Sequence, residues 1–427
     1  MTSTVPDTSG IDLDELTSAD REPDMDYWGH SSATRAATWK KFRDERPVAF
    51  MPELPFQDFP AGPGYWNVTR FDDVMHVSRH PDVFCSGKGT NIFDLPVEVS
   101  EFMGSMINMD APRHTRFRKI VNKAFTPRRV AQIDEDVRVK ARELVSDAAE
   151  HGPGDFVDLL ASPLPLQIIC EMMGIPREQW PQILHATNTI LGDDTTTPDI
   201  ATLMGEVMGM AQIASQVGED RLANPQDDLV SAMMHAEVDG ERLQPMEMAS
   251  FFILLAAAGN ETTRNAISHG TKLLQDHPDQ RRALLADYDD LAPGAVEEIV
   301  RFATPVIHFR RTATQDTVIG DQPIAEGDKV VMWYESANRD ERHFDDPYSF
   351  DIRRHPNDHV GFGAGGPHYC LGANLARREI RVMLEEIYRW LPDIEVGEPD
   401  YLRSPFIHGV KHMPCTFSPP KQAIPAA

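Results

Sequence analysis

The spacing of apolar side chains along the chain predicts a mostly helical protein. Between residues 113 and 285, apolar residues recur at intervals of three and four, and Pro and Gly interrupt the pattern. The predicted helices of this region span 127–152, 176–191, 201–222 and 245–274. Further along, Ile380, Met383, Leu384 and Ile387 form one apolar stripe at helical spacing, which predicts another helix.

Short strands are predicted on either side of the helical region. They fall at 48–51 and 65–69, within 308–333 and within 393–417. No period of 20–50 residues repeats, and no low-complexity linker divides the middle of the chain. We therefore predict a mainly α protein with small β-sheets (α+β), organised as a single domain over residues 24–427. Residues 1–23 are acidic without an apolar core and are predicted to be a disordered tail.

The charge balance narrows the possible partners. The chain has 67 acidic and 41 basic residues, giving a net charge of -26, which argues against nucleic acid. The longest apolar run, 251–259, is much shorter than the roughly 20 residues that span a bilayer, so we interpret it as part of a buried helix. No targeting signal precedes it, and we expect a cytoplasmic protein without a membrane span.

Segment 360–373 contains the most informative cysteine. Cys370 lies where a glycine-rich loop ends and a helix is predicted to begin, so unpaired backbone N–H groups and the helix dipole favour its thiolate form. Gly363, Gly365 and Gly366 let the loop backbone approach a flat partner, Gly372 removes a side chain just past the sulfur, and Phe362 is placed to shield the sulfur. No second cysteine or histidine stands at metal-ligand spacing. This pattern suits one axial ligand of a metal whose other positions are filled; the alternative is a buried structural cysteine.

This segment resembles the haem-binding loop of the cytochrome P450 superfamily, whose usual form is F-G-x-G-x-H-x-C-x-G. His368 matches, whereas Phe362 lies eight residues before Cys370 instead of seven, so the loop is one residue longer. The resemblance implies the cytochrome P450 fold, with haem b (iron protoporphyrin IX) between the long central helix and the helix after the cysteine loop. It also implies that Cys370 is the axial ligand and that Phe362, Gly363 and Gly372 contact the cofactor.

A second motif, 258–263, lies inside the long apolar helix. An acid and a hydroxyl in a buried helix are costly unless they serve a purpose, and Thr262 can bond to its own helix carbonyls and open the turn. The motif resembles the family's oxygen-binding kink. That resemblance implies proton handling by Glu261 and Thr262 as catalytic residues, and a haem contact at Ala258. The alternative is a packing glycine beside a helix-bending threonine.

A third motif is the Glu298/Arg301 pair, whose i, i+3 spacing places both charges on one helix face. On its own it would be an ordinary surface pair. Its place about seventy residues before Cys370 resembles the family's characteristic helix pair, which implies a structural role. Together, the motifs follow the family order from about Asp110 to Arg378.

Four basic residues resemble the family's partners of the haem propionates. His114 and Arg118 are i, i+4 neighbours on one helix, Arg311 follows on a strand, and His359 precedes the cysteine loop. Arg310 is the rival of Arg311.

The resemblance implies a monooxygenase that inserts one oxygen atom of O2 into a C–H bond. The wall residues that it implies are apolar, which favours a lipophilic substrate such as a fatty acid, branched lipid, sterol or terpenoid. They are Ile92, Phe93, Met106, Ile107, Leu255, Ala258, Val306 and Ile307. Segments 258–266, 366–370 and 371–377 look most like actinobacterial members that hydroxylate terminal methyl groups.

The electron source is expected to be external, because the chain has no flavin or iron–sulfur motif. A basic island without acids lies between Asp110 and Asp134, and it suits an acidic ferredoxin served by its reductase. Its members are Arg113, Arg116, Arg118, Lys119, Lys123, Arg128 and Arg129. The alternative is that these charges serve propionates and solvent.

Two other functions are open to a haem-thiolate protein. A peroxide-driven peroxygenase would normally lack the Glu261/Thr262 pair, and a non-catalytic haem sensor would not need it.

Overall fold

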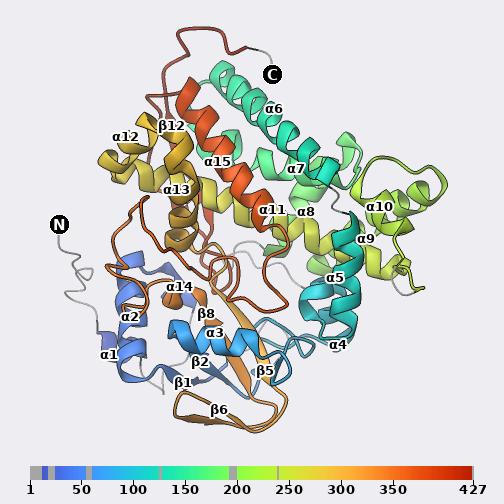
Figure 1. Cartoon of the computed structure of the whole chain (residues 1–427), viewed down its shortest axis with the longest axis vertical. Helices are drawn as coiled ribbons and strands as arrows, with labels where there is room; N and C mark the ends of the chain where they lie inside the picture. The colour runs from blue at the N-terminus through green and yellow to red at the C-terminus, as the bar shows by residue number, and fades with distance from the viewer. Residues whose placement is uncertain are drawn as a thin grey trace.

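The computed structural model describes residues 12–17, 25–53, 60–124, 127–191, 200–237 and 240–425. Helices dominate it, as predicted (Figure 1). The longer ones are α2 (Ser32–Glu45), α3 (Phe71–Arg79), α4 (Val97–Gly104), α5 (Arg113–Ala124), α6 (Pro127–His151), α7 (Pro163–Met172), α8 (Trp180–Leu191), α9 (Ile200–Ala223), α11 (Pro245–Asp276), α12 (Pro278–Ala286), α13 (Tyr288–Ala303) and α15 (Ala373–Trp390). Shorter ones are α1 (Leu13–Thr17), α10 (Leu229–His235), α14 (Tyr334–Ala337), the 3-10 turns η1 (Met25–Gly29), η2 (Ser105–Asn108) and η4 (Arg177–Gln179), and the π-turn η3 (Val157–Ala161).

The largest sheet joins strands from both ends of the chain. Its order is β1 (Val48–Met51), β2 (Tyr65–Val68), β8 (Lys329–Trp333), β5 (His308–Ala313) and β3 (Phe84–Cys85), and β2 runs parallel to β8. Figure 1 shows these blue and orange strands side by side in the lower part of the view, below α11. Three small sheets pair β4 (Gly154–Asp155), β12 (Pro414–Thr416) and β9 (Glu395–Val396); β10 (Asp400–Tyr401) and β11 (Val410–His412); and β6 (Thr317–Ile319) and β7 (Gln322–Ile324).

Helix α11 is the central helix of the protein. It begins with Pro245 and a capping box between Gln244 and Glu247, and it continues without a break to Asp276. Phe252 is fully buried, so the apolar run forms a core helix as predicted. Helix α11 packs against α7, α9, α13 and α15, which places the middle of the chain between the cysteine-loop helix and the outer helices. Among the described residues, no helix is both long and apolar enough to cross a membrane.

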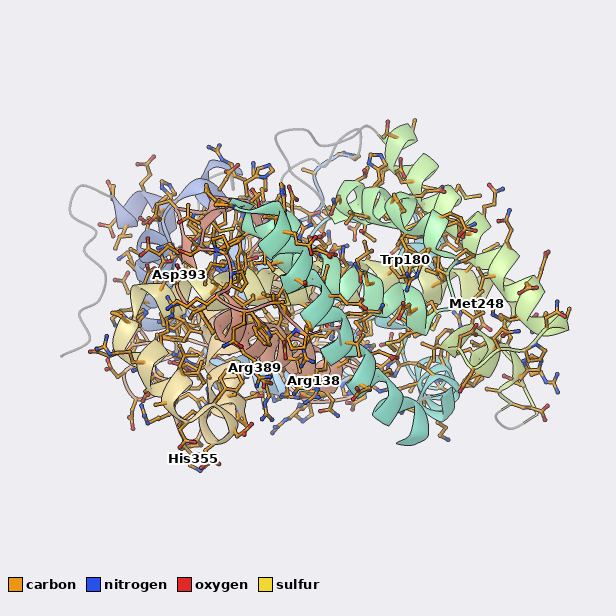
Figure 2. The ribbon with its side chains drawn as sticks, turned by 90° about the horizontal axis from the view of Figure 1, so that it is seen from above. Arg138, Trp180, Met248, His355, Arg389 and Asp393 are labelled. Carbon is orange, nitrogen blue, oxygen red and sulfur yellow. The ribbon has the colours of Figure 1, made fainter. Side chains whose placement is uncertain are left out.

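Helix α15 follows the cysteine loop and is held on two sides. Its predicted stripe is buried, with Ile387 fully buried. On its other side, Glu386 is completely buried and lies within 3.5 Å of guanidinium groups of both Arg138 on α6 and Arg389. Figure 2 shows Arg138 and Arg389 close together between the two helices. These contacts fix the helix that begins three residues after Cys370.

The Glu298/Arg301 pair is structural, as the sequence indicated. Both side chains are fully buried on α13, with 2.7 Å between Arg301 Nη2 and Glu298 Oε1. The guanidinium also donates to the carbonyls of Asn338, Pro347 and Ser349. The network therefore ties α13 to the long segment that leads into the cysteine loop.

The predicted acidic tail is only partly described. Residues 13–17 form α1, and Asp14 pairs with Lys41 of α2 at 2.9 Å. This part of the tail is therefore helical in the structure, whereas the rest of 1–23, apart from residue 12, lies outside the described residues.

Candidate functional site

The cysteine loop is folded back on itself in front of α15. The Cys370 N–H donates to the Phe362 carbonyl at 2.9 Å, and the Phe362 ring lies under the Arg377 guanidinium. The loop rests against α3, where the Ser78 hydroxyl donates to the Gly365 carbonyl. Gly366 has a positive φ of 78°, and a Cβ there would lie 2.4 Å from the Ser78 carbonyl oxygen. Only glycine fits this contact.

The Cys370 thiol has competing electrostatic influences. Surrounding protein atoms raise its pKa, whereas the Gly372 and Ala373 N–H groups and the charges of Arg118 and Arg377 lower it. The sequence predicted a thiolate from the helix terminus alone, and the loss of hydration next to the surrounding protein atoms outweighs that contribution to the pKa. Even so, the thiol is accessible, and a coordinated metal would deprotonate it.

Three of the four predicted propionate partners lie beside the cysteine loop. Arg118 donates to the Pro367 and Tyr369 carbonyls at 2.9 and 2.7 Å. The His114 ring packs at a tilt of 39° against His368 with ring centroids 4.2 Å apart, and Arg311 lies close enough to lower the pKa of both imidazoles. Burial is the largest cause of the lowered pKa at each histidine. The cluster is therefore two guanidinium cations and two neutral imidazoles.

His368 is the member of this cluster that the sequence-based site omitted. It lies two residues before Cys370, and its Nε2 is 3.1 Å from the Ser86 hydroxyl. The match of His368 to the loop motif was the signal that could have assigned it to the site.

The structure places His359 outside the cluster. Its Nε2 lies 3.0 Å from Glu297, which also binds Arg377. Burial alone would raise the pKa of Glu297, but His359 and Arg377 together hold this pKa far below its usual range. With a carboxylate of the protein as its partner, His359 serves the contact between α13 and α15 instead of the predicted propionate. Arg310, the rival of Arg311, also points elsewhere, toward Asp94.

Helix α11 presents the predicted acid and alcohol on different sides. Ala258 is exposed and Thr262 partly accessible in the largely buried middle of the helix, and the Thr262 hydroxyl donates to the Ala258 carbonyl at 2.9 Å. Glu261 is buried and binds Arg264 at 2.8 Å, which in turn donates to Asn188. Burial raises the pKa of Glu261, and Arg264 partly offsets this. The predicted opening of the turn is absent, because the helix is continuous here.

The predicted wall residues divide into two groups. Those with partly accessible side chains are Ile92, Phe93, Ile107, Leu255 and Val306. Met106 and Ile307 are buried, and Ile307 packs in a cluster with Trp333. Val306 lies just before β5 and keeps a partly accessible side chain, so Val306 and not Ile307 is available to a ligand. Met106 and Ile307 are therefore corrected to core residues.

The donor set fits a flat cofactor with two carboxylates. Arg118 and Arg311 form no ion pair with any carboxylate among the described residues, and His114 Nε2 is buried without a hydrogen-bond partner. Buried polar groups are rarely left unsatisfied, so this cluster calls for an anionic ligand. The accessible Cys370 thiol can supply the axial ligand of haem b, the cationic cluster can bind its two propionates, and the small side chain of Ala258 leaves room for the flat ring.

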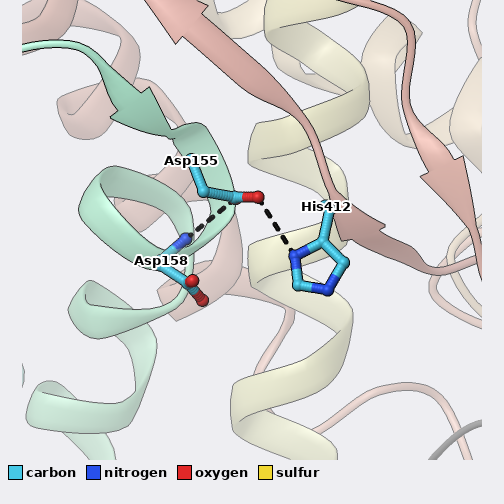
Figure 3. A group of neighbouring side chains, drawn as sticks. All are labelled: Asp155, Asp158 and His412. Atoms are coloured by element: carbon cyan, nitrogen blue, oxygen red, sulfur yellow. Dashed lines mark hydrogen bonds and ion pairs between the residues drawn. The ribbon is translucent and has the colours of Figure 1, made fainter.

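A separate group of possible metal ligands does not belong to this site. Figure 3 shows Asp155, Asp158 and His412, whose ligand atoms lie within 4.8 Å of one another. The Asp155 carboxylate accepts a hydrogen bond from the Val157 N–H at the start of η3 and lies 3.1 Å from Nδ1 of His412 on β11. Asp155 therefore connects η3 with β11. Local hydrogen bonding accounts for this cluster.

A protein-family model described as Cytochrome P450 matches residues 179–404. The chain belongs to the cytochrome P450 family. It is similar to the methyl-branched lipid omega-hydroxylase of Mycobacterium tuberculosis, with 50% identity over 92% of this chain and 94% of that protein. It is also similar to the steroid C26-monooxygenase of Rhodococcus jostii, with 43% identity over 87% of this chain and 79% of that protein.

The fold comparison agrees. A cytochrome P450 of Mycobacterium marinum, solved in complex with pseudoionone, superposes with a TM-score of 0.88 at 42% identity, covering 94% of this chain and all of that one. The protein is thus a cytochrome P450 monooxygenase, and its family and fold imply a cysteine-ligated haem b. The predicted family, fold class and cofactor are confirmed.

Proposed function

We propose that this cytochrome P450 hydroxylates a terminal methyl carbon of a methyl-branched lipid or of a steroid side chain. Its 50% identity to the methyl-branched lipid omega-hydroxylase over 92% of the chain carries this proposal. The apolar, partly accessible wall residues Ile92, Leu255 and Val306 support a lipophilic substrate, since such surface favours apolar ligands.

Haem b would be held by Cys370 as thiolate ligand and by Arg118, Arg311 and the two imidazoles of the cationic cluster, His114 and His368. When bound, it supplies the activation of O2. The cationic cluster would neutralise the two propionates through charge-assisted bonds. The N–H groups at the start of α15 would donate to the thiolate and set its basicity.

Glu261 and Thr262 would handle protons on the α11 side. The Thr262 hydroxyl is partly accessible and can donate a hydrogen bond at the site. Glu261 has a raised pKa, so it retains its proton more readily than an exposed acid does. General acid catalysis requires such a group within hydrogen-bond reach, directly or through one water. Because Arg264 holds Glu261 in the structure, a side-chain rotation away from Arg264 is required.

Electrons would come from a ferredoxin and its reductase. Lys119 is exposed on α5, and Arg79 is exposed on α3 with its guanidinium against Gly365. Arg116 is neutralised by Glu241 and Glu247, so it contributes less than the sequence suggested. The side chains of Lys123, Arg128 and Arg129 lie outside the described residues. We expect the remaining basic surface to receive an acidic carrier.

The decisive experiment compares spectra and products. The reduced protein with CO should show the Soret band of a thiolate-ligated haem, and Cys370→His should abolish it. Turnover with ferredoxin, reductase and a methyl-branched fatty acid or a steroid should give a terminal alcohol by mass spectrometry. Hydroxylation only at internal carbons would contradict the regiochemistry. Equal turnover with hydrogen peroxide and no ferredoxin would favour a peroxygenase.

A further inference from the structure

The loop between β3 and α4 is held by two basic side chains of the main sheet. Arg310 on β5 faces Val331, and Lys329 on β8 faces Thr312, so both basic residues lie on the same face of the sheet. The loop carries the wall residues Ile92 and Phe93, which have partly accessible side chains.

Arg310 binds this loop at several points. Its backbone N–H donates to the Thr90 carbonyl at 2.8 Å, and its guanidinium donates to the Lys88 carbonyl at 2.6 Å and the Asn91 carbonyl at 3.1 Å. It also forms an ion pair with Asp94 at 2.6 Å. One buried side chain therefore fixes the whole path of the loop.

Lys329 connects the same loop to a second acid. Its ammonium lies 2.7 Å from Asp94 and 2.7 Å from Glu53, and it donates to the Ile92 carbonyl at 3.1 Å. The side chains of Lys329 and Glu53 are 4% and 3% exposed, whereas Asp94 is 52% exposed. The buried pair is complete without Asp94, because Glu53 neutralises Lys329.

We propose that Asp94 is a releasable latch that positions the Ile92–Phe93 segment over the substrate site and controls ligand entry. When Asp94 leaves, Lys329 keeps Glu53, whereas Arg310 keeps only backbone carbonyl partners of the loop. Release therefore leaves one buried cation, Arg310, without a carboxylate, and this cost keeps the latch mostly closed. The Asp94 carboxylate itself is half exposed, so water can solvate it when it leaves. Asp94 is thus a positioning residue, and its effect on substrate entry rests on the proposed function.

Hydrogen exchange in the holoenzyme tests the latch directly. Asp94→Asn should increase amide exchange in peptides covering residues 86–96 by more than about fivefold, because the buried Arg310 guanidinium loses its carboxylate partner. The global unfolding midpoint should be nearly unchanged. Asp94→Glu should restore protection, because it keeps the charge within reach of both cations.

The matched control is Asp44→Asn. Asp44 is also half exposed and binds two cations, Lys40 at 2.6 Å and Arg342 at 3.0 Å, but it lies on α2. For both variants and the wild type, stopped-flow mixing with 4-phenylimidazole, followed by the shift of the Soret band, measures the association and dissociation rates of this ligand. We expect faster association and dissociation for Asp94→Asn alone, and wild-type rates that approach those of the variant as salt rises.

Unchanged exchange in residues 86–96 together with unchanged ligand rates would overturn the latch. A lowered unfolding midpoint with protection lost across the whole molecule would overturn it too, because Asp94 would then be an ordinary structural residue. The exchange readout needs no substrate or turnover, so it stands apart from the proposed hydroxylation.

Discussion

Two ion pairs with the same i, i+3 spacing occupy opposite environments in this protein. Glu298 and Arg301 are fully buried, whereas the side chains of Asp279 and Arg282 are 82% and 72% exposed. Removing one partner of a buried pair leaves an uncompensated charge away from water, while water replaces the partner of an exposed charge. Sequence spacing alone cannot distinguish these cases.

Truncation of the two arginines should therefore differ sharply. Arg301→Ala should lower the free energy of unfolding by about 3–5 kcal/mol, since the buried Glu298 keeps only Arg354 as a cation and three backbone carbonyls lose their donor. Arg282→Ala should change it by less than about 1 kcal/mol. Urea unfolding followed by circular dichroism measures both values, and similar losses would contradict the buried network as the cause.

At the scale of the element, the long helix α11 owes its close packing to a glycine. A Cβ at Gly270 would lie 2.9 Å from the Ile299 side chain of α13, which is fully buried and has little room to move. A Cβ at Gly205, on the exposed face of α9, would meet no other atom within 4 Å. Both glycines are helical, so both pay the same intrinsic penalty relative to alanine.

Alanine at these two glycines should thus have opposite effects. Gly205→Ala should stabilise the protein by about 0.5–1 kcal/mol through helix propensity alone. Gly270→Ala gains the same helix-propensity contribution, but overpacking against Ile299 destabilises the protein by about 1–3 kcal/mol. A net decrease in the free energy of unfolding is therefore expected. Thermal unfolding of the two variants is the measurement, and a stabilising Gly270→Ala would mean that α11 and α13 can separate freely.

A buried acid joins α11 to α15. Glu379 is 2% exposed and hydrogen-bonds to Thr263, and burial raises its pKa from 4.5 to about 8. Between those two pH values the folded state binds a proton that the unfolded state lacks, so stability falls as pH rises. Below pH 4.5 the carboxyl is protonated in both states, and its contribution no longer changes.

Glu379→Gln should remove this pH dependence, because glutamine imitates the protonated acid. The urea midpoints of wild type and variant should agree near pH 4.5, and the variant should be the more stable protein near pH 8. Glu395→Gln, on an exposed residue of β9, is the control and should follow the wild type. Parallel curves for all three proteins would contradict a raised pKa at Glu379.

For the whole molecule, the net charge of -26 and the local basic surface oppose each other. Under the proposed function, an acidic ferredoxin would be repelled at long range by the net charge and attracted at short range by Lys119 and Arg79. Added salt screens separations beyond the Debye length, about 10 Å at 0.1 M, before it weakens close contacts.

The rate of reduction by ferredoxin should therefore pass through a maximum as salt rises. The double variant Lys119→Gln, Arg79→Gln should lower that maximum. Its reduction rates at low salt should match those of the wild type, because the net charge dominates there. Arg282→Gln is the control, because that charge is already paired with Asp279. Stopped-flow reduction under CO measures the rate, and a steady rise with salt in wild type would contradict local docking.

The sequence by itself determined the helical class, the positions of most helices and strands, the cysteine loop and the family. Those features depend on short-range patterns: apolar spacing, glycine placement and motif order. His114, Arg118 and Arg311 could also be selected from the sequence, because each belongs to a local motif.

Only the tertiary structure decided which side chain meets which partner. It gave His359 to Glu297, placed His368 beside His114, and buried Ile307 while leaving Val306 accessible. It also turned Arg310 into the anchor of a loop more than two hundred residues earlier in the chain. The physical reason is that burial and ion pairing depend on segments far apart in sequence, so even the neighbours Val306 and Ile307 differ in burial in a way that their local pattern does not specify.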